Sequence, residues 1–265
     1  MKSRNKGSSE QENTTPADTF LALITHELRT PITLIRSQIQ MNLSGYYGKI
    51  TKEQKKSFEM IHKNADRLNH LVGDILDITN LKSGQMKFIL EKTSLAIILR
   101  SIKEQYKPIC KEKNIKIQFK KSPKVTFICD KLRIFQVLSN LINNSLKFTS
   151  AKGKITIWAE EKKHKIQFFV QDNGLGIQKS DHTSVFSPFK QYSDFSTNKK
   201  GYGLGLSICR GIVEAHKGKI WSKEIPQGCL ITFTLSNNLK EQQKEKSILD
   251  TRDDKLNTRF VNAWE

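Results

Sequence analysis

The sequence has no long hydrophobic run. Its longest uninterrupted apolar stretches are five residues long, such as Leu95–Leu99, whereas a membrane-spanning helix needs about 20. The start of the chain, MKSRNKGSSEQENTTP, also lacks the apolar segment of a signal peptide. We therefore expect a soluble cytoplasmic chain with no membrane span, either complete in itself or the cytosolic part of a longer protein.

Cysteine motifs are absent as well. The four cysteines are scattered and form no C-x-x-C pair with a nearby histidine cluster: Cys110, Cys129, Cys209 and Cys229. This spacing excludes the common zinc-site and disulfide-framework patterns. We expect buried thiols in a reducing compartment.

Acidic residues are scarce relative to basic ones, 26 against 45, which gives a net charge of +19. Residues 100–124 alone hold nine basic and two acidic residues. Such a field could attract nucleic acid, anionic lipid or an acidic protein. No zinc-finger spacing or aromatic RNA-binding motif accompanies it, so we expect a solvated lysine-rich face and no nucleic-acid partner.

Two amphipathic helices are predicted in residues 16–84, after a disordered segment at 1–15. Their apolar residues recur at helical spacing, with a heptad pattern in the second: Phe20, Ile24, Leu28, Ile35 and Ile39, then Phe58, Ile61, Ala65, Leu68, Val72 and Ile75. A two-helix hairpin cannot bury both stripes by itself. We therefore predict a homodimer whose paired hairpins form a four-helix bundle.

Residues 85–236 alternate helix-like and strand-like segments. Helices are expected at 95–113, 131–148 and 204–216, and strands at 115–119, 125–128, 154–158, 165–170, 219–223 and 230–235. This mixture predicts an α+β sandwich with helices on one face of a mixed sheet. The charged tail, 237–265, is expected to be disordered or weakly helical.

His26 lies within the first predicted helix but points away from its apolar stripe, on the face that carries Arg29, Thr30 and Thr33. The adjacent Glu27 can accept a proton from one ring nitrogen and leave the other nucleophilic. Pro31 leaves the carbonyl of Glu27 without its helical donor, so we expect a bend just below the imidazole. The helix alone leaves two interpretations open, an ordinary surface histidine or a reactive one.

Three further segments indicate a nucleotide site. In NLINNSLKFT, the side chains of Asn140, Asn144 and Lys147 share one helix face, which suits Mg²⁺ and phosphate or is simply a polar surface. DNGLGI, from Asp172 to Ile177, follows a strand and places a carboxylate beside two glycines. GYGLGLSI, residues 201–208, places glycines before a helix but matches neither the P-loop nor the G-x-G-x-x-G spacing.

Taken in order, THELRTP, NLINNSLKFT, DNGLGI, SPFKQY and GYGLGLSI resemble the transmitter region of two-component sensor histidine kinases, over residues 17–236. The resemblance implies a multidomain protein. An all-α dimerisation and histidine-phosphotransfer hairpin (16–84) is followed by an α+β sandwich ATP-binding catalytic domain (85–236) of the type shared with gyrase, Hsp90 and MutL.

The resemblance also implies site roles. His26 would accept the phosphoryl group, Glu27 would activate it, and Thr30 would assist dephosphorylation of the partner. Asn144 would bind Mg²⁺ and Asp172 would read adenine. Further ATP contacts would come from the matching motif positions: Asn140, Lys147, Phe148, Gly174, Gly176, Ile177, Phe189, Gly201, Gly203, Leu204, Gly205 and Leu206. Phe186 and Phe189 would lie beside a mobile ATP lid at 192–201.

Three positions depart from the family pattern: Lys200 and Lys217 stand where glycine is common, and Ser145 where alanine is usual. We interpret His216 as a helix C-terminal histidine favoured by the helix dipole. The remaining histidines, at 62, 70, 164 and 182, are taken as surface residues.

The sequence therefore predicts a kinase that autophosphorylates on His26 with ATP and Mg²⁺ and passes the group to an aspartate of a response regulator receiver domain. Two alternatives stay open. One is a nucleotide-responsive dimeric scaffold without autokinase activity. The other is a nucleic-acid-linked ATPase of the MutL or gyrase type, which the net charge suggests.

Overall fold

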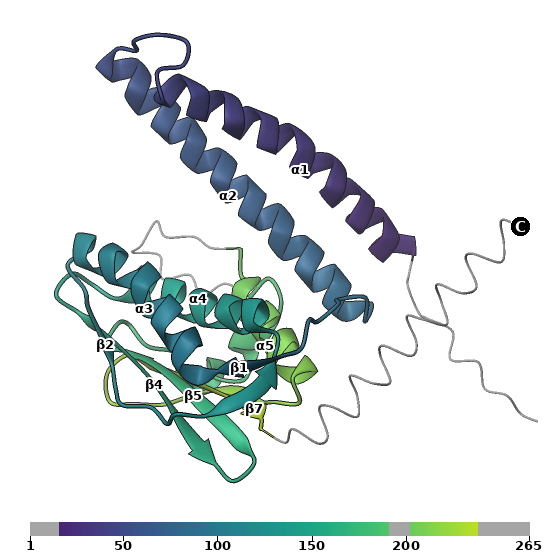
Figure 1. Cartoon of the computed structure of the whole chain (residues 1–265), viewed down its shortest axis with the longest axis vertical. Coiled ribbons are helices and arrows are strands. Elements are labelled where there is room, and N and C mark those ends of the chain that lie inside the picture. The colour runs from purple at the N-terminus through teal and green to yellow at the C-terminus, as the bar shows by residue number, and fades with distance from the viewer. Residues whose placement is uncertain (1–15, 191–201, 238–265) are drawn as a thin grey trace, which may run out of the picture. The chain divides into compact units, whose positions relative to one another are not determined.

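The computed structural model describes residues 16–190 and 202–237 (Figure 1). The side chains of residues 16–22 and of His26 fall outside this description. The chain divides between Met86 and Lys87 into two compact units. Within the described ranges, no helix is long and apolar enough to cross a membrane.

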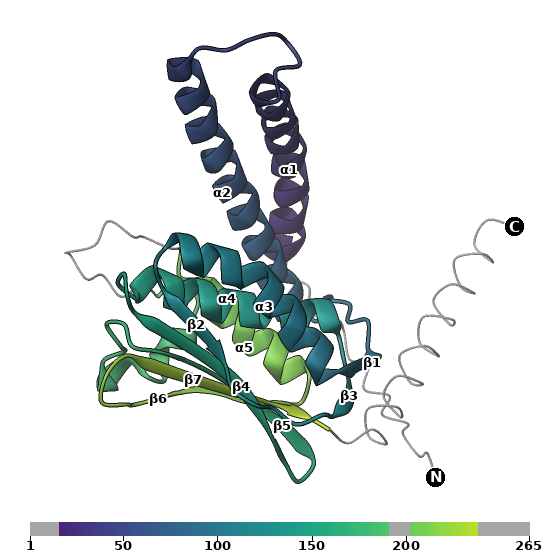
Figure 2. The ribbon, with the colours of Figure 1, turned by 60° about the vertical axis from the view of Figure 1, so that its left-hand side comes forward.

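The first unit is a hairpin of two long helices, α1 (Pro16–Leu43) and α2 (Lys52–Lys82), which run side by side (Figures 1 and 2). α1 continues through Pro31. α2 begins at a capping box, in which Gln54 N–H donates to the Thr51 hydroxyl (3.2 Å) and Thr51 N–H donates to the Gln54 side chain (2.8 Å). This reciprocal pair satisfies two backbone donors that the first turn leaves without helical partners.

An inner seam holds the hairpin together. Its buried residues repeat every seven positions in both helices: Thr25, Ile32 and Ile39 in α1, and Ala65, Val72 and Thr79 in α2. A seven-residue repeat keeps one stripe of each helix facing its neighbour. The heptad pattern expected from the sequence thus produces a packed helix pair.

A second, outer stripe of the hairpin stays exposed. Ile39 is buried as expected, but Ile24, Leu28 and Ile35 of the same predicted stripe are 36%, 47% and 51% exposed. On α2, Ile61 and Leu68 are also exposed. One neighbouring helix covers only one edge of a broad apolar face, so a single hairpin leaves the other edge in water.

The second unit is built on a five-stranded mixed sheet with strand order β2-β4-β5-β7-β6. β2 pairs parallel to β4, and the other neighbours pair antiparallel. The strands are β2 (Lys116–Phe119), β4 (Lys154–Lys162), β5 (Lys165–Asp172), β6 (Ile220–Lys223) and β7 (Cys229–Ser236). A separate two-stranded sheet pairs β1 (Glu91–Ser94) with β3 (Thr126–Cys129).

Three helices, α3 (Leu95–Glu112), α4 (Lys131–Phe148) and α5 (Gly205–Ala215), cover one face of this sheet (Figure 2). Two short 3₁₀ turns, η1 (Lys179–Asp181) and η2 (Ser184–Phe186), precede α5. The core lies between the helices and the sheet, where Phe168 and Phe233 stack at 4.6 Å between ring centroids. Both rings are fully buried.

The predicted helical region followed by an α+β domain with a mixed sheet is confirmed. The segment at β1, EKTS, was not expected to be a strand because it lacks alternating apolar residues. It is extended because it pairs with β3. β5 also continues farther than expected, and Asp172 is its last residue rather than part of the following turn.

Candidate active site

The THELRTP motif, Thr25–Pro31, lies in the middle of α1. Thr25 is buried in the inner seam, whereas Glu27 and Thr30 are exposed. The backbone of His26 is helical, and its side chain lies outside the described part of the structure. The motif therefore combines one anchoring position with two solvent-facing ones.

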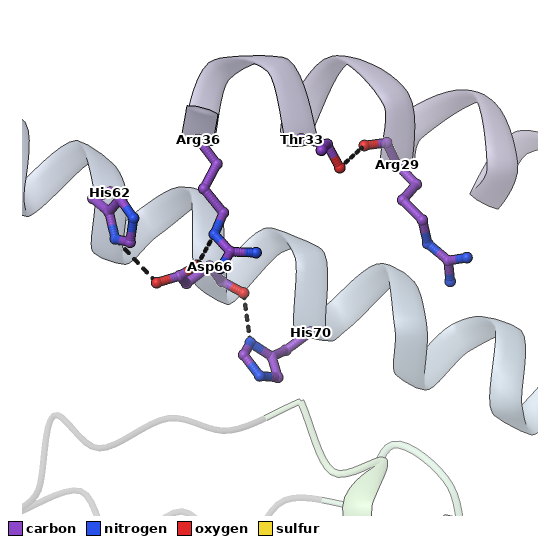
Figure 3. A network of polar contacts seen from close by, with 6 residues as sticks. All are labelled: Arg29, Thr33, Arg36, His62, Asp66 and His70. Carbon is purple, nitrogen blue, oxygen red and sulfur yellow. Dashed lines mark hydrogen bonds and ion pairs between the residues drawn. The ribbon is translucent and has the colours of Figure 1, made fainter. Parts of the chain in front are cut away.

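A polar network on the same hairpin ties α1 to α2 (Figure 3). Arg36 Nε lies 2.9 Å from Asp66 Oδ1, and His62 Nδ1 lies 3.1 Å from Asp66 Oδ2. His70 Nδ1 lies 2.6 Å from the backbone carbonyl of Asp66, which can only accept, so that nitrogen carries the proton. The two histidines, expected as plain surface residues, thus both bond to Asp66.

In the second unit, α4 divides into an apolar side and a polar side. Its apolar residues are buried: Ile134, Val137, Leu138, Leu141, Ile142 and Leu146. Asn140 and Asn144 are half-buried on the other side. Asn140 Nδ2 lies 3.4 Å from the carbonyl of Gly205, at the start of α5, and Lys147 Nζ lies 4.7 Å from the centroid of the Phe148 ring.

Asp172 is a buried carboxylate at the end of β5. Its Oδ1 accepts from the backbone N–H groups of Gly174 (3.0 Å) and Cys229 (3.3 Å). Its Oδ2 accepts from the Ser145 hydroxyl (2.7 Å). Burial raises the pKa of Asp172, and these three hydrogen bonds oppose that rise because they favour the charged form.

Glycines let the backbone pack closely around this carboxylate. A Cβ atom at Gly174 would meet the carbonyl oxygen of Phe148 at 2.5 Å. Gly228 has φ of +88°, and a Cβ there would collide with the Asp172 carbonyl. Gly176, with φ of +80°, adopts a conformation that favours glycine. The half-buried Ile177 follows it.

The start of α5 forms the third part of the site. Leu204 is buried, Leu206 is half-buried, and a Cβ at Gly205 would lie 3.6 Å from Asn140 Cγ, an ordinary contact. Gly203 has φ of +72°, and its carbonyl accepts from Phe189 N–H at 3.0 Å. The first turn of a helix presents N–H groups without helical acceptors, here beside the polar side of α4.

Of the aromatic pair predicted beside the lid, Phe186 is buried and Phe189 is 68% exposed. The predicted lid at 192–201, including Lys200 and Gly201, lies outside the described residues.

Two family models match the chain in the order of these two units. The His Kinase A (phospho-acceptor) domain matches residues 17–84. The histidine kinase-, DNA gyrase B- and HSP90-like ATPase matches residues 129–239. The chain belongs to the sensor histidine kinase family. It corresponds to the transmitter region of these kinases.

Similar proteins agree with this assignment. The chain is 32% identical to the adaptive-response sensory kinase SasA of Crocosphaera subtropica, over 85% of this chain and 60% of SasA. Full-length ShkA in complex with AMPPNP matches with a TM-score of 0.71 and 27% identity, over 84% of this chain and 47% of ShkA. Histidine kinase ThkA in complex with response regulator protein TrrA matches with a TM-score of 0.57 and 28% identity, over 84% of this chain and 62% of that chain. The chain spans from about a quarter to three fifths of the length of the curated relatives it matches.

His216 lies at the C-terminus of α5, as predicted. It is buried there, where Nδ1 contacts the carbonyl of Ile212 (2.8 Å) and Nε2 accepts from Asp130 N–H (3.0 Å). Burial lowers the pKa of His216. An Nε2 that accepts a hydrogen bond carries no proton, so the ring bridges α5 and Asp130 in its neutral form, and these two contacts hold it there rather than the helix dipole.

Asp130, the partner of His216, is a junction within the second unit. Its Oδ1 caps α4 by accepting from Arg133 N–H (3.0 Å), and its Oδ2 accepts from Ile89 N–H (2.9 Å). Its own N–H donates to Nε2 of His216, at the end of α5. The first residues after the unit boundary are thus bonded to the start of the helix that carries Asn140 and Asn144.

The sequence analysis missed two contributors to this site. Ser145 was read only as a departure from the usual alanine, yet its hydroxyl bonds the Asp172 carboxylate. Gly228 carried only a turn signal, yet it packs against the backbone of Asp172. Both contacts join segments that are far apart in the sequence, so no local pattern indicates them.

Proposed function

We propose that this chain is an ATP-dependent protein histidine kinase that phosphorylates His26 and transfers the group to an aspartate of a response regulator. The observation that carries the proposal is the grouping in the second unit of a buried strand-end carboxylate, the polar side of α4 and the start of α5. The phospho-acceptor hairpin precedes this group in the same chain.

Asp172 is proposed to accept a hydrogen bond from the exocyclic amine of adenine. Gly174 supports this role because a Cβ there would lie 3.2 Å from Asp172 Oδ1. Gly176 supports it because a Cβ there would meet the carbonyl oxygen of Gly228, which packs against the Asp172 backbone. Phe148, Ile177 and Phe189 would line the base. Phe189 suits this task because its ring is largely exposed.

The phosphates are proposed to lie between α4 and the first turn of α5. Backbone N–H groups from Gly203 to Leu206 can donate to phosphate oxygens, and Asn140 and Lys147 would add polar and positive groups.

The half-buried amide of Asn144 fits Mg²⁺, which prefers neutral and charged oxygen ligands and keeps several waters. When bound, the ion would neutralise charge on the β- and γ-phosphates. Asn144 would supply one oxygen to it and hold the triphosphate in register with α5.

Phosphoryl transfer requires a neutral imidazole at His26. One ring nitrogen attacks the γ-phosphorus in line, the N–P bond forms as the bond to the β–γ bridging oxygen breaks, and ADP leaves. Glu27 is proposed to take the proton from the other ring nitrogen. Thr30, one turn farther along α1, is proposed to act when the phosphorylated regulator is hydrolysed.

The partners follow from the hairpin. We propose a homodimer in which the outer stripe of Ile24, Leu28, Ile35, Ile61 and Leu68 is buried against a second copy. The receiver domain of a response regulator would dock near His26, and the ThkA–TrrA complex supports this class of partner. Because ATP is the phosphoryl donor, we place the reaction in the cytosol.

Incubation with γ-labelled ATP and Mg²⁺ tests the proposal. We expect acid-labile, alkali-stable label on the wild-type chain and none on His26→Gln or Asn144→Asp. Equal labelling of all three proteins would overturn it. Transfer of label to a receiver domain would then test the second step.

A further inference from the structure

Ser145 stands on α4 directly after Asn144. Its side chain is buried, and its hydroxyl lies 2.7 Å from Oδ2 of Asp172. A serine hydroxyl in a helix often bonds back to a carbonyl of the preceding turn. Here it bonds instead to a carboxylate 27 residues away in sequence.

The two oxygens of Asp172 have different surroundings. Oδ1 takes two backbone N–H groups, from Gly174 and Cys229, and these two bonds do not depend on any side chain. Within residues 16–190 and 202–237, the one side-chain donor to this carboxylate is Ser145, and it binds Oδ2. Ser145 is thus the residue whose side chain can change how Oδ2 is held, beside the two backbone donors that hold Oδ1.

We propose that Ser145 is a positioning residue that acts through Asp172 to select a purine carrying an amine at C6. This inference rests on the proposed function, since it takes Asp172 as the residue that faces the base. It adds a determinant of base selectivity that lies on α4 and does not itself touch the nucleotide.

The selectivity follows from hydrogen-bond polarity. An ionised carboxylate only accepts, so it pairs with the amine of adenine and repels the carbonyl at C6 of hypoxanthine or guanine. A protonated carboxyl could donate to that carbonyl. Ser145 donates to Oδ2 and so favours the ionised form, against the effect of burial on Asp172.

The thiol of Cys229 is the other titratable group beside Asp172. Burial and the Asp172 charge raise its pKa to about 12, so it stays neutral at physiological pH. It therefore does not compete with Ser145 in setting the charge of the carboxylate.

A protein–ligand double-mutant cycle tests this inference. Wild type and Ser145→Ala are titrated calorimetrically in Mg²⁺ buffer with three ligands: ADP, purine riboside diphosphate and inosine diphosphate. Purine riboside diphosphate has hydrogen in place of the amine at C6, and inosine diphosphate has a carbonyl there. Diphosphates avoid phosphoryl transfer during the titration. We expect Ser145→Ala to weaken ADP about 10-fold, to leave purine riboside diphosphate unchanged and to narrow the preference for ADP over inosine diphosphate.

The substitution should not disturb folding, because alanine is the better helix former; circular dichroism checks this. Ser139→Ala is the matched control on the same helix and should bind all three ligands as wild type does.

Equal losses of affinity for ADP and for purine riboside diphosphate would show a packing effect and overturn the inference, as would an unchanged affinity for ADP. In both cases wild-type binding of ADP leaves the proposed function standing. A wild-type chain that binds none of the diphosphates contradicts the proposed function as well.

Discussion

At Asp172, burial and hydrogen bonding have opposite effects on the charged carboxylate. A carboxylate loses hydration when it is buried at the end of β5, and it regains stabilisation from Ser145, Gly174 and Cys229. Burial raises the pKa of Asp172, and the three hydrogen bonds oppose that rise because they favour the charged form. The same three donors hold the carboxyl group in place.

We predict that Asp172→Asn weakens ADP binding by about 2 kcal/mol, the usual contribution of a hydrogen bond to a charged group. The amide would place its NH₂ where Oδ2 now accepts, and two donors would face each other at the adenine amine. Calorimetric titration measures the change. Glu160→Gln, on β4, is the control, and an unaltered affinity in Asp172→Asn would show that this carboxylate does not face the base.

A second prediction concerns Asp74 on α2. Burial, followed by the charge of Asp77, raises the pKa of Asp74 to about 6, while His70 acts in the opposite direction. The folded hairpin therefore binds this proton more tightly than the unfolded chain, whose Asp pKa is about 3.9. Stability from this group is complete below about pH 4 and is lost as the pH rises through about 6.

Asp74→Asn should remove this pH dependence and raise hairpin stability at pH 7 by about 1 kcal/mol, less than the full shift because the side chain is partly solvated. Hydrogen-exchange protection of α2 amides, corrected for intrinsic rates, measures it between pH 4 and 7. Protection that declines with pH equally in the variant and the wild type would contradict the assignment to Asp74.

Much of the site at this scale follows from local motifs. Asp172, Asn140 and Asn144 were expected because carboxylate and amide groups at those positions suit a base, phosphates and Mg²⁺. Ser145 and Gly228 could not be expected, because their roles depend on where Asp172 lies after folding. The roles of His26, Glu27 and Thr30 stay predictions that the labelling experiment decides.

At the scale of elements, the helix-capping residues and the apolar periodicity of the sequence predicted most of the helices and strands. α4 begins and ends at the expected residues because Asp130 caps its first turn and the apolar side repeats along its length. Sheet order was beyond the sequence, since period-two alternation identifies strands without naming their neighbours. β1 depended wholly on pairing with β3.

Gly73 offers a prediction on α2. It stands inside the helix, and a Cβ added there would meet no atom within 4 Å. Gly73→Ala should therefore stabilise the hairpin by about 1 kcal/mol, since glycine is that much poorer a helix former than alanine. Thermal unfolding followed by helical circular dichroism measures the gain. A lower melting temperature for Gly73→Ala would contradict this prediction.

Gly228→Ala is the opposite case. It should destabilise the chain, because its Cβ would collide with the Asp172 backbone.

At the scale of the whole molecule, the exposed outer stripe of the hairpin is the surface that we propose pairs two copies of the chain. A charge placed on it would meet an apolar partner surface and lose hydration there. We predict that Ile61→Glu combined with Leu68→Glu converts the dimer to a monomer in light scattering coupled to gel filtration.

Met60→Glu is the matched control, because Met60 is 61% exposed on the same helix but lies one residue off the heptad stripe. It should leave the dimer intact. A double variant that remains dimeric would show that the copies associate elsewhere.

The Asp130 junction has a mechanical consequence. Tension or torque applied to the chain at Ile89 passes through two hydrogen bonds into the first turn of α4 and, by way of His216, into the last turn of α5. The segment that follows the hairpin is thus hydrogen-bonded to the second unit from Ile89 onward. A displacement of this segment would reach α4 and α5, the two helices between which we propose that the phosphates lie.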